Sequence, residues 1–386
     1  MGGNLLIVHG GGPTAVINAS LYGAIRQAQE SPRVDRVLAA IGGTGGLLKE
    51  DLRDVTDLPD GELRGLLSSP ASAIGTSRDA LEAPEYEAMV PILEKHNIRY
   101  VLMNGGNGTM DTCGKLYRRC KEKGIAVIGI PKTMDNDLAV TDHSPGFGSA
   151  ARYMAGSVAE VCCDVAGLPI HVVVVEALGR NAGWVTAASA LAADSYGHGP
   201  DLIYLPERDF CEEEFLADVE QLIRTKGHGV VVASEGLHYA DGTPIVEPVF
   251  TVGRATYFGD VSAHLANLII KKLGYKARAE KPGILGRASI AWQSDTDRTE
   301  AELCGRAAVD AVTTGQSGKM VALRRVPGPN YRCETFLVDI QDVMMTERKL
   351  PDEFINERGN NITEAFKEWC RPLIGAPLPK LMDLRP

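Results

Sequence analysis

The chain has 386 residues, of which 44% are hydrophobic, so it is long enough to form two domains with sizeable cores. Its formal net charge of -10 argues against nucleic acid as a partner, because no Lys/Arg-rich run provides a local basic patch. It contains no stretch of about 18 uncharged apolar residues and no N-terminal charged segment followed by an apolar one. We therefore expect a cytoplasmic protein that does not contact a membrane.

Glycine-punctuated strands alternate with helical stretches along the chain, which predicts an α/β fold with mostly parallel sheets. The strands are expected at 4–8, 35–41, 100–103, 125–130, 171–176, 201–205 and 229–234. The runs at 172–175 and 229–233 are unbroken and rich in valine, as is typical of strands buried on both faces. No Pro/Gly/Ser-rich break marks a domain boundary.

Two glycine-rich turns follow predicted strands. The segment 9–14 follows the strand at 4–8 and precedes a helix expected near Ala15, and the segment 105–109 follows the strand at 100–103 and opens a second helix. Glycines in such turns let backbone N–H groups approach an anion, and a helix N-terminus favours negative charge. Neither turn has the Lys-Ser/Thr pair of a Walker A loop or the dinucleotide fingerprint. The turns predict a polyphosphate site, with purely structural turns as the alternative.

The run Pro131-Lys132-Thr133-Met134-Asp135-Asn136-Asp137 follows the predicted strand at 125–130. Open α/β sheets bind ligands at the carboxyl ends of their strands. A carboxylate there can accept a proton from an attacking hydroxyl, and a lysine can offset phosphate charge. The run is typical of a phosphoryl-transfer site, although by itself it also fits a solvated loop with an Asn-Asp turn.

These segments, together with Glu176–Trp184 and Ser234-Glu235-Gly236, occur in the order and spacing of the 6-phosphofructokinase family. The resemblance covers about residues 4–345 and is strongest to the bacterial branch that contains many pyrophosphate-dependent enzymes. It implies two three-layer α/β/α domains with the active site in the cleft between them. The larger, donor-binding domain would span 1–146 with part of 278–345, and the smaller, sugar-phosphate-binding domain would span 147–277 with part of 346–386.

The resemblance also implies a role for individual residues. Asp135 would be the general base that takes the proton from the sugar 1-hydroxyl, while Lys132, Thr133 and Arg180 would complete the catalytic group. The donor would be bound by Gly11, Arg78, Gly106, Asn107, Gly108 and Thr109. The substrate would be bound by Thr133, Asp135, Asp137, Leu178, Gly179, Arg180, Glu235, Arg278 and Arg287, the last two holding the 6-phosphate. Arginine suits phosphate because its planar fork binds two oxygens.

The donor is the least determined feature of this resemblance. Pyrophosphate-dependent relatives carry an aspartate at the position of Gly108, which blocks the ATP α-phosphate, and here that space is open. They also carry the lysine that stands here as Lys132, but a subset of the family combines the same glycine and lysine and uses ATP. The sequence therefore favours ATP as the donor, with pyrophosphate as the alternative.

Mg²⁺ is the implied cofactor, with Asn107 as the candidate metal ligand. A neutral amide is a weaker ligand for a hard cation than the aspartate of many relatives, so we expect the metal to be held mainly through phosphates and water. The expected function is glycolytic transfer of phosphate to fructose 6-phosphate by a homodimer or homotetramer. A non-catalytic sugar-phosphate-binding regulatory subunit is disfavoured because the expected catalytic residues are present.

Overall fold

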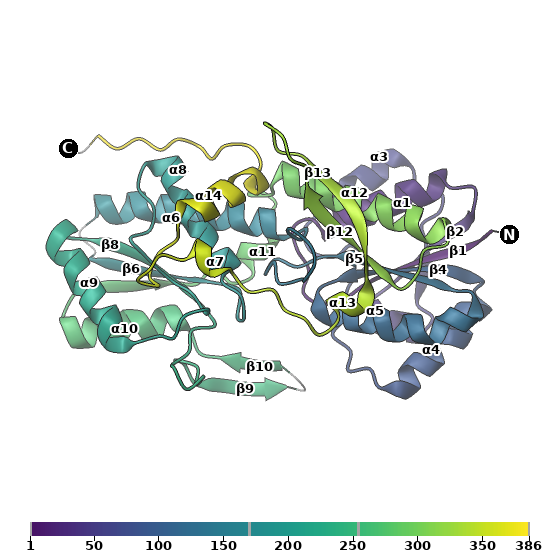
Figure 1. Cartoon of the computed structure of the whole chain (residues 1–386), viewed down its shortest axis with the longest axis horizontal. Coiled ribbons are helices and arrows are strands. Elements are labelled where there is room, and N and C mark those ends of the chain that lie inside the picture. Colours follow the sequence, from purple (N-terminus) through teal and green to yellow (C-terminus); the bar gives the residue numbers. More distant parts are fainter. Residues whose placement is uncertain (1, 169–170, 253–254, 385–386) are drawn as a thin grey trace. The chain divides into compact units, whose positions relative to one another are not determined.

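The computed structural model describes residues 2–168, 171–252 and 255–384 (Figure 1). The chain divides into two compact units. The first unit consists of Met1–Phe147 and Asp295–Arg348, and the second consists of Gly148–Ser294 and Lys349–Pro386. Each unit is therefore built from two separate stretches of the chain. None of the helices in the described ranges is both long enough and apolar enough to cross a bilayer.

The first unit contains a seven-stranded sheet in the order β13-β12-β5-β4-β1-β2-β3. Its strands are β1 (Gly3–His9), β2 (Val34–Ala40), β3 (Leu52–Asp54), β4 (Ile98–Gly105), β5 (Ala126–Pro131), β12 (Lys319–Arg325) and β13 (Cys333–Asp339). The five central strands run parallel, and β3 and β13 are antiparallel edge strands. The carboxyl ends of β1, β4 and β5 consequently meet at one edge of the sheet.

Helices cover both faces of this sheet. They are α1 (Ile17–Glu30), α2 (Gly43–Leu48), α3 (Asp60–Leu63), α4 (Ala83–Lys95), α5 (Asn107–Cys120), α12 (Asp295–Thr313) and α13 (Ile340–Val343). Successive residues of a strand point to opposite faces, and β1 follows this rule. Leu6 packs in one buried cluster with α4 and α5, whereas Leu5 and Ile7 pack in the other with α1 and α12. This double burial accounts for the continuous apolar runs that predicted these strands.

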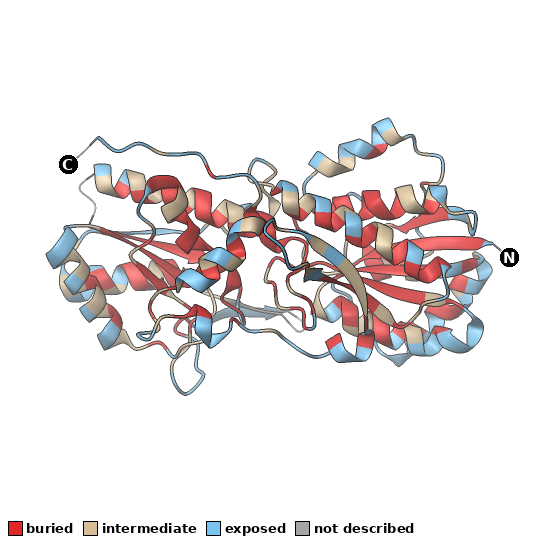
Figure 2. Cartoon of the chain, turned by 45° about the horizontal axis from the view of Figure 1, so that its top comes forward, coloured by how far each residue is buried: buried red, intermediate tan, exposed pale blue. Residues whose placement is uncertain are grey.

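The second unit contains a four-stranded parallel sheet in the order β11-β6-β8-β7. Its strands are β6 (Val172–Ala177), β7 (Leu202–Tyr204), β8 (Gly229–Ser234) and β11 (Ala277–Glu280), and a separate antiparallel ribbon pairs β9 (Pro248–Val252) with β10 (Ala255–Phe258). The helices are α6 (Phe147–Gly167), α7 (Trp184–Ala188), α8 (Ala193–Tyr196), α9 (Glu212–Lys226), α10 (Val261–Leu273), α11 (Leu285–Ala288) and α14 (Glu364–Cys370). The inner strands β6 and β8 are wholly buried, as Figure 2 shows in red.

Candidate active site

The first glycine turn follows β1. The N–H groups of Gly10 and Gly11 donate to the carbonyls of Asn104 and Ser77, both at 2.9 Å. Gly11 has a φ of +76°, in the left-handed region that favours glycine. The neighbouring strand and loop therefore already use the N–H groups of Gly10 and Gly11, and the role of Gly11 in binding the donor stays a prediction. Here glycine serves close packing, since a Cβ at Gly10 would overlap the Thr109 hydroxyl.

The second glycine turn joins β4 to α5. Gly106 occupies the N-cap position, and its carbonyl accepts the N–H groups of Thr109 and Met110, both at 2.9 Å. The earlier N–H groups of a helix have no partner within the helix, so this end can face an anion. A Cβ on Gly108 would meet no atom within 4 Å of the described residues, so a side chain could be accommodated there.

Lys132 links these two turns at the end of β5. Its side chain is only 3% exposed, and its ammonium group donates to the carbonyl of Gly12. Its backbone N–H donates to the carbonyl of Gly105 at 3.1 Å. The structure thus brings a buried cation beside both glycine turns, an arrangement that can offset phosphate charge.

His9 is neutral, so Lys132 supplies the positive charge beside the two glycine turns. His9 is buried, and its Nδ1 lies 2.8 Å from the hydroxyl of Ser72. Burial, followed by the charge of Lys132, lowers the pKa of His9 to about 3. Arg78, which the sequence assigned to the donor, is exposed one residue beyond Ser77.

The loop that carries Asp135 is held by local hydrogen bonds. The N–H of Asp135 donates to the hydroxyl of Thr133 at 3.1 Å. Asn136 has a φ of +55°, and its side-chain oxygen accepts the N–H of Ser144 at 3.0 Å. The N–H of Thr133 donates to the carbonyl of Pro145 at 3.1 Å. The segment at 144–145 therefore braces the loop, while Asp135 itself is half-buried.

The side chains of Asp137 and Asn107 form a hydrogen-bonded pair between the loop of Asp135 and the second glycine turn. The Asn107 amide nitrogen donates to a carboxylate oxygen of Asp137 at 2.9 Å. Burial raises the pKa of Asp137, and hydrogen bonds from Thr133 and Asn107 oppose this shift. The Oδ1 atom of Asn107 is buried and has no hydrogen-bond partner in the part of the chain that the structure describes. Such an oxygen, next to a carboxylate, fits a hard cation such as Mg²⁺.

The remaining predicted residues lie in the second unit, and those at 178–180 and 235 follow the carboxyl ends of β6 and β8. The hydroxyl of Ser234 donates to the carbonyl of Gly179 at 2.8 Å, and the N–H of Gly179 donates to Glu235 at 3.1 Å. Gly179 has a φ of +117°. A Cβ on Gly236 would overlap the carbonyl oxygen of Arg180, so only glycine allows this approach. The two motifs that the sequence singled out therefore pack directly against each other.

The charged groups of this unit differ in burial. Burial raises the pKa of Glu235. Arg180 is exposed, and its guanidinium donates to the carbonyl of Thr256 at 3.0 Å. Leu178 is half-buried, Arg278 is exposed on the edge strand β11, and Arg287 is half-buried in α11.

Sequence reasoning missed a buried network behind the loop of Asp135. The ring nitrogens of His143 lie 2.8 Å from Asp142 and 2.6 Å from Glu300. Tyr331 donates to the other oxygen of Glu300 at 2.6 Å, and Arg325 donates to Asp142 at 2.9 Å. The adjacent Asp142-His143 pair was the only sequence signal, because the partners come from distant segments.

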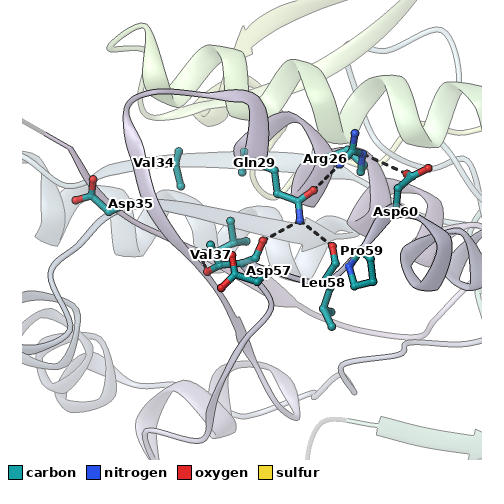
Figure 3. Close-up of a pocket in the computed structure, with 11 residues that line it drawn as sticks. Arg26, Gln29, Val34, Asp35, Val37, Asp57, Leu58, Pro59 and Asp60 are labelled. Atoms are coloured by element: carbon teal, nitrogen blue, oxygen red, sulfur yellow. Dashed lines mark hydrogen bonds and ion pairs between the residues drawn. The ribbon is translucent and has the colours of Figure 1, made fainter.

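Figure 3 shows a separate hollow of about 410 Å³ in the first unit. It lies where β2 begins, at the opposite ends of the strands from the glycine turns, and contains none of the predicted site residues. Arg26 pairs with Asp60 at 3.3 Å, and the Gln29 amide donates to the carbonyls of Thr56 and Leu58 at 2.8 and 3.0 Å. Because these polar groups already have partners, we assign the hollow no part in the chemistry.

Comparisons with known proteins agree with this geometry. A family model described as phosphofructokinase matches residues 4–312. The pyrophosphate–fructose 6-phosphate 1-phosphotransferase of Xanthomonas campestris pv. campestris (strain B100) is 38% identical, covering 98% of this chain and 93% of that protein. The sulfofructose kinase of Alkalicoccus urumqiensis is 34% identical, covering 95% and 94%. The crystal structure of a pyrophosphate-dependent phosphofructokinase from Marinobacter aquaeolei has a TM-score of 0.88 at 34% identity, covering 98% and 95%.

These similarities decide some of the sequence predictions. The fold class, with α/β units and mostly parallel sheets, is confirmed. ATP as the donor is not confirmed, and the alternative, pyrophosphate, fits the names of these relatives better. The roles of individual residues and of the two domains stay predictions.

Proposed function

The chain belongs to the phosphofructokinase family, and we propose that it transfers a phosphoryl group from pyrophosphate to the 1-hydroxyl of fructose 6-phosphate. The donor is supported by the names of relatives that align over nearly the whole chain, at 35 to 38% identity. The structural observation that carries the proposed phosphoryl transfer, with either donor, is the buried ammonium of Lys132 beside two glycine turns. A donor without a nucleoside is recognised through its phosphates alone, and a poorly screened cation suits that task.

In this proposal, the first unit supplies the proton acceptor and the donor contacts. Asp135 takes the proton of the sugar 1-hydroxyl as the oxygen attacks the terminal phosphorus of pyrophosphate, and orthophosphate leaves. The hydrogen bond from the Asp135 N–H to Thr133 fixes the loop that carries this carboxylate. Lys132 and the N-terminus of α5 offset the charge that spreads over the phosphate oxygens. Asp135 also distinguishes this proposal from a non-catalytic regulatory subunit, which would need no base.

The second unit supplies the acceptor contacts. Glu235 accepts hydrogen bonds from sugar hydroxyls, and Arg278 and Arg287 bind the 6-phosphate through their guanidinium forks. Arg180 contacts the transferred phosphoryl group. Arg180 and Arg278 are exposed, so an anionic ligand can reach their guanidinium groups.

Asn107 and Asp137 would hold Mg²⁺ in this proposal, because their side chains are hydrogen-bonded to each other and Asn107 Oδ1 lacks a partner among the described residues. When bound, the cation neutralises phosphate charge and orients the donor. A cation would also favour the ionised form of Asp137, whose pKa burial raises.

ATP remains the second candidate donor because of one observation. The space beside Gly108 is open among the described residues, so the carboxylate with which the resemblance explains exclusion of nucleotides is missing. A lysine at 132 favours phosphates in general and does not discriminate between the two donors.

Initial rates with pyrophosphate and with ATP, on one preparation with fructose 6-phosphate and Mg²⁺, test the proposal. Fructose 1,6-bisphosphate is measured by coupling to aldolase. We expect pyrophosphate to exceed ATP in kcat/KM by about tenfold or more. A faster reaction with ATP would overturn the donor and leave the acceptor chemistry intact.

A second arm tests the acceptor, because one relative is named a sulfofructose kinase. The same assay is run with 6-deoxy-6-sulfofructose, in which a sulfonate of lower charge replaces the phosphate. We expect fructose 6-phosphate to be preferred, since Arg278 and Arg287 gain more from a dianion. Preference for the sulfonate would overturn the assignment of the acceptor.

A further inference from the structure

The antiparallel ribbon of β9 and β10 contacts the exposed side chain of Arg180. The guanidinium of Arg180 donates to the Thr256 carbonyl at 3.0 Å and lies over the ring of Phe258, 4.9 Å from its centroid. Both contacts come from β10, which Figure 1 shows paired with β9 alone. A strand outside the main sheet of the second unit thus holds the arginine that follows β6.

Packing against the hydrophobic core explains only part of this ribbon, namely Phe258, which is partly buried against the core. On β9, Val249 is 68% exposed and Phe250 is 51% exposed, although both side chains are large and apolar. A two-stranded ribbon is only marginally stable in water without a hydrophobic face to bury. The ribbon therefore makes specific contacts with Arg180, whereas its exposed apolar residues contribute little to the core.

The root of the ribbon is anchored to the same strand that leads to Arg180. After Phe258 the chain enters α10, where the N–H of Ser262 donates to the carboxylate of Glu176 at 3.0 Å. Glu176 belongs to β6, is 3% exposed and also pairs with Lys281 at 3.1 Å. Phe258 and Arg180 each lie only four residues from this anchor, which keeps the two segments close together.

We propose that the ribbon is a positioning element for Arg180, and that Phe258 orients the guanidinium toward the transferred phosphoryl group. This inference rests on the proposed function, in which Arg180 contacts that group. A long arginine side chain at an exposed site samples many rotamers, and an aromatic face together with a carbonyl acceptor restricts them. Restricting the side chain before the reaction favours the transition state over unproductive arrangements.

The test compares Phe258→Leu with Phe258→Tyr and with Phe250→Leu. Leucine removes the aromatic face, tyrosine keeps it, and the substitution at 250 makes the same change on the partner strand. Exposed cation–π contacts correspond to about a two- to fivefold effect, so we expect Phe258→Leu to lower kcat by about that factor. The KM for pyrophosphate should change by less than about twofold, because ground-state binding is retained. Phe258→Tyr and Phe250→Leu should match the wild type.

A double-mutant cycle with Arg180→Gln separates positioning from a structural effect. If Phe258 acts through Arg180, Phe258→Leu should cause no further loss in the Arg180→Gln background. Equal losses of kcat in both backgrounds, or an unchanged or higher kcat in Phe258→Leu alone, would overturn the inference. The wild-type rate with pyrophosphate tests the proposed function. The role of the ribbon is tested separately, by the kcat of each variant relative to the wild type, measured with whichever donor is active.

Discussion

A buried histidine should make the stability of the first unit fall at alkaline pH. His143 lies between the carboxylates of Asp142 and Glu300, at 2.8 and 2.6 Å, and is 2% exposed. Burial alone lowers the pKa of His143, but the hydrogen bonds to Asp142 and Glu300 and their charges outweigh it and raise the pKa to about 9. The imidazolium therefore balances two acids, assisted by Arg325 on Asp142.

The sign and size of the effect follow from linkage. A histidine in an unfolded chain titrates near 6.5, so the stabilisation by His143 is complete below that pH and is lost as the pH rises through about 9. At about 1.4 kcal/mol per pKa unit, the raised pKa corresponds to about 3 kcal/mol of unfolding free energy. Burial alone would raise the pKa of Asp142, but its contacts with His143 and Arg325 outweigh burial and hold the pKa well below its usual range. The contact with His143 is the interaction already counted, so at alkaline pH only the contact with Arg325 persists.

Urea unfolding of the wild type and of His143→Gln, at pH 6.5 and 9.5 in matched salt, measures this contribution. The wild type should lose about 3 kcal/mol between the two values, and the variant should be less stable at pH 6.5 but much less dependent on pH. His96→Gln is the matched control, because His96 pairs with Glu50 at 2.6 Å but both side chains are about one-third exposed. Exposed ion pairs contribute little, so that variant should follow the wild type. Parallel decline of the wild type and His143→Gln would refute the argument.

Three further predictions concern the proposed reaction. Asp135→Asn should lower kcat by about 10²-fold or more with little change in either KM, which steady-state kinetics would reveal; a variant with near-normal kcat would exclude Asp135 as the base. Arg278→Ala and Arg287→Ala should each raise the KM for fructose 6-phosphate by about tenfold to a hundredfold, since a charged hydrogen bond contributes about 1.5 to 3 kcal/mol, and a selective rise in donor KM would contradict their assignment. Gly108→Asp should leave the rate with pyrophosphate nearly unchanged and suppress any rate with ATP, because a carboxylate there repels an α-phosphate; equal loss with both donors would show that the space is not donor-specific.

The sequence predicted the strands that are buried on both faces. The expected strands at 4–8, 125–130 and 229–234 correspond to β1 (Gly3–His9), β5 (Ala126–Pro131) and β8 (Gly229–Ser234). Each is wholly or almost wholly buried, so its apolar run is continuous and easily recognised. The ends of β1 and β5 differ from the expected ones by one residue, and those of β8 agree.

Most edge strands and both strands of the ribbon were missed for a physical reason, although the edge strand β7 (Leu202–Tyr204) corresponds to the strand expected at 201–205. β11 (Ala277–Glu280) is mostly exposed, and the only apolar side chains of its sequence Ala-Arg-Ala-Glu are two alanines. Val249 and Phe250 of β9 are similarly exposed. Such strands are defined by their hydrogen-bonding partners rather than by burial, and one sequence does not reveal those partners. β12 differs, since its buried run Met320–Leu323 is a signal that sequence reasoning overlooked.

In the candidate site, too, the sequence predicted motifs that are continuous in the chain and missed contacts between residues far apart in it. The motifs at 105–109 and 131–137 were recognisable because each is continuous in the chain, and the structure brings them together through Lys132. The network of His143 joins residues about 30 to 190 positions apart, so no local pattern encodes it. Likewise, the need for glycine at 236 arises from the carbonyl of Arg180, which approaches from a neighbouring strand.

The buried network of His143 is connected to the loop that carries the proposed base, Asp135. His143 fixes the segment whose next two residues, Ser144 and Pro145, bond to Asn136 and Thr133. Thr133 in turn accepts the N–H of Asp135, so hydrogen bonds link the backbone that follows His143 to the loop of the proposed base. A carboxylate that must meet a hydroxyl within hydrogen-bond distance depends on such support, because a displacement of about 1 Å is already costly for catalysis. The ionic network therefore serves the geometry of Asp135 as well as the stability of the fold.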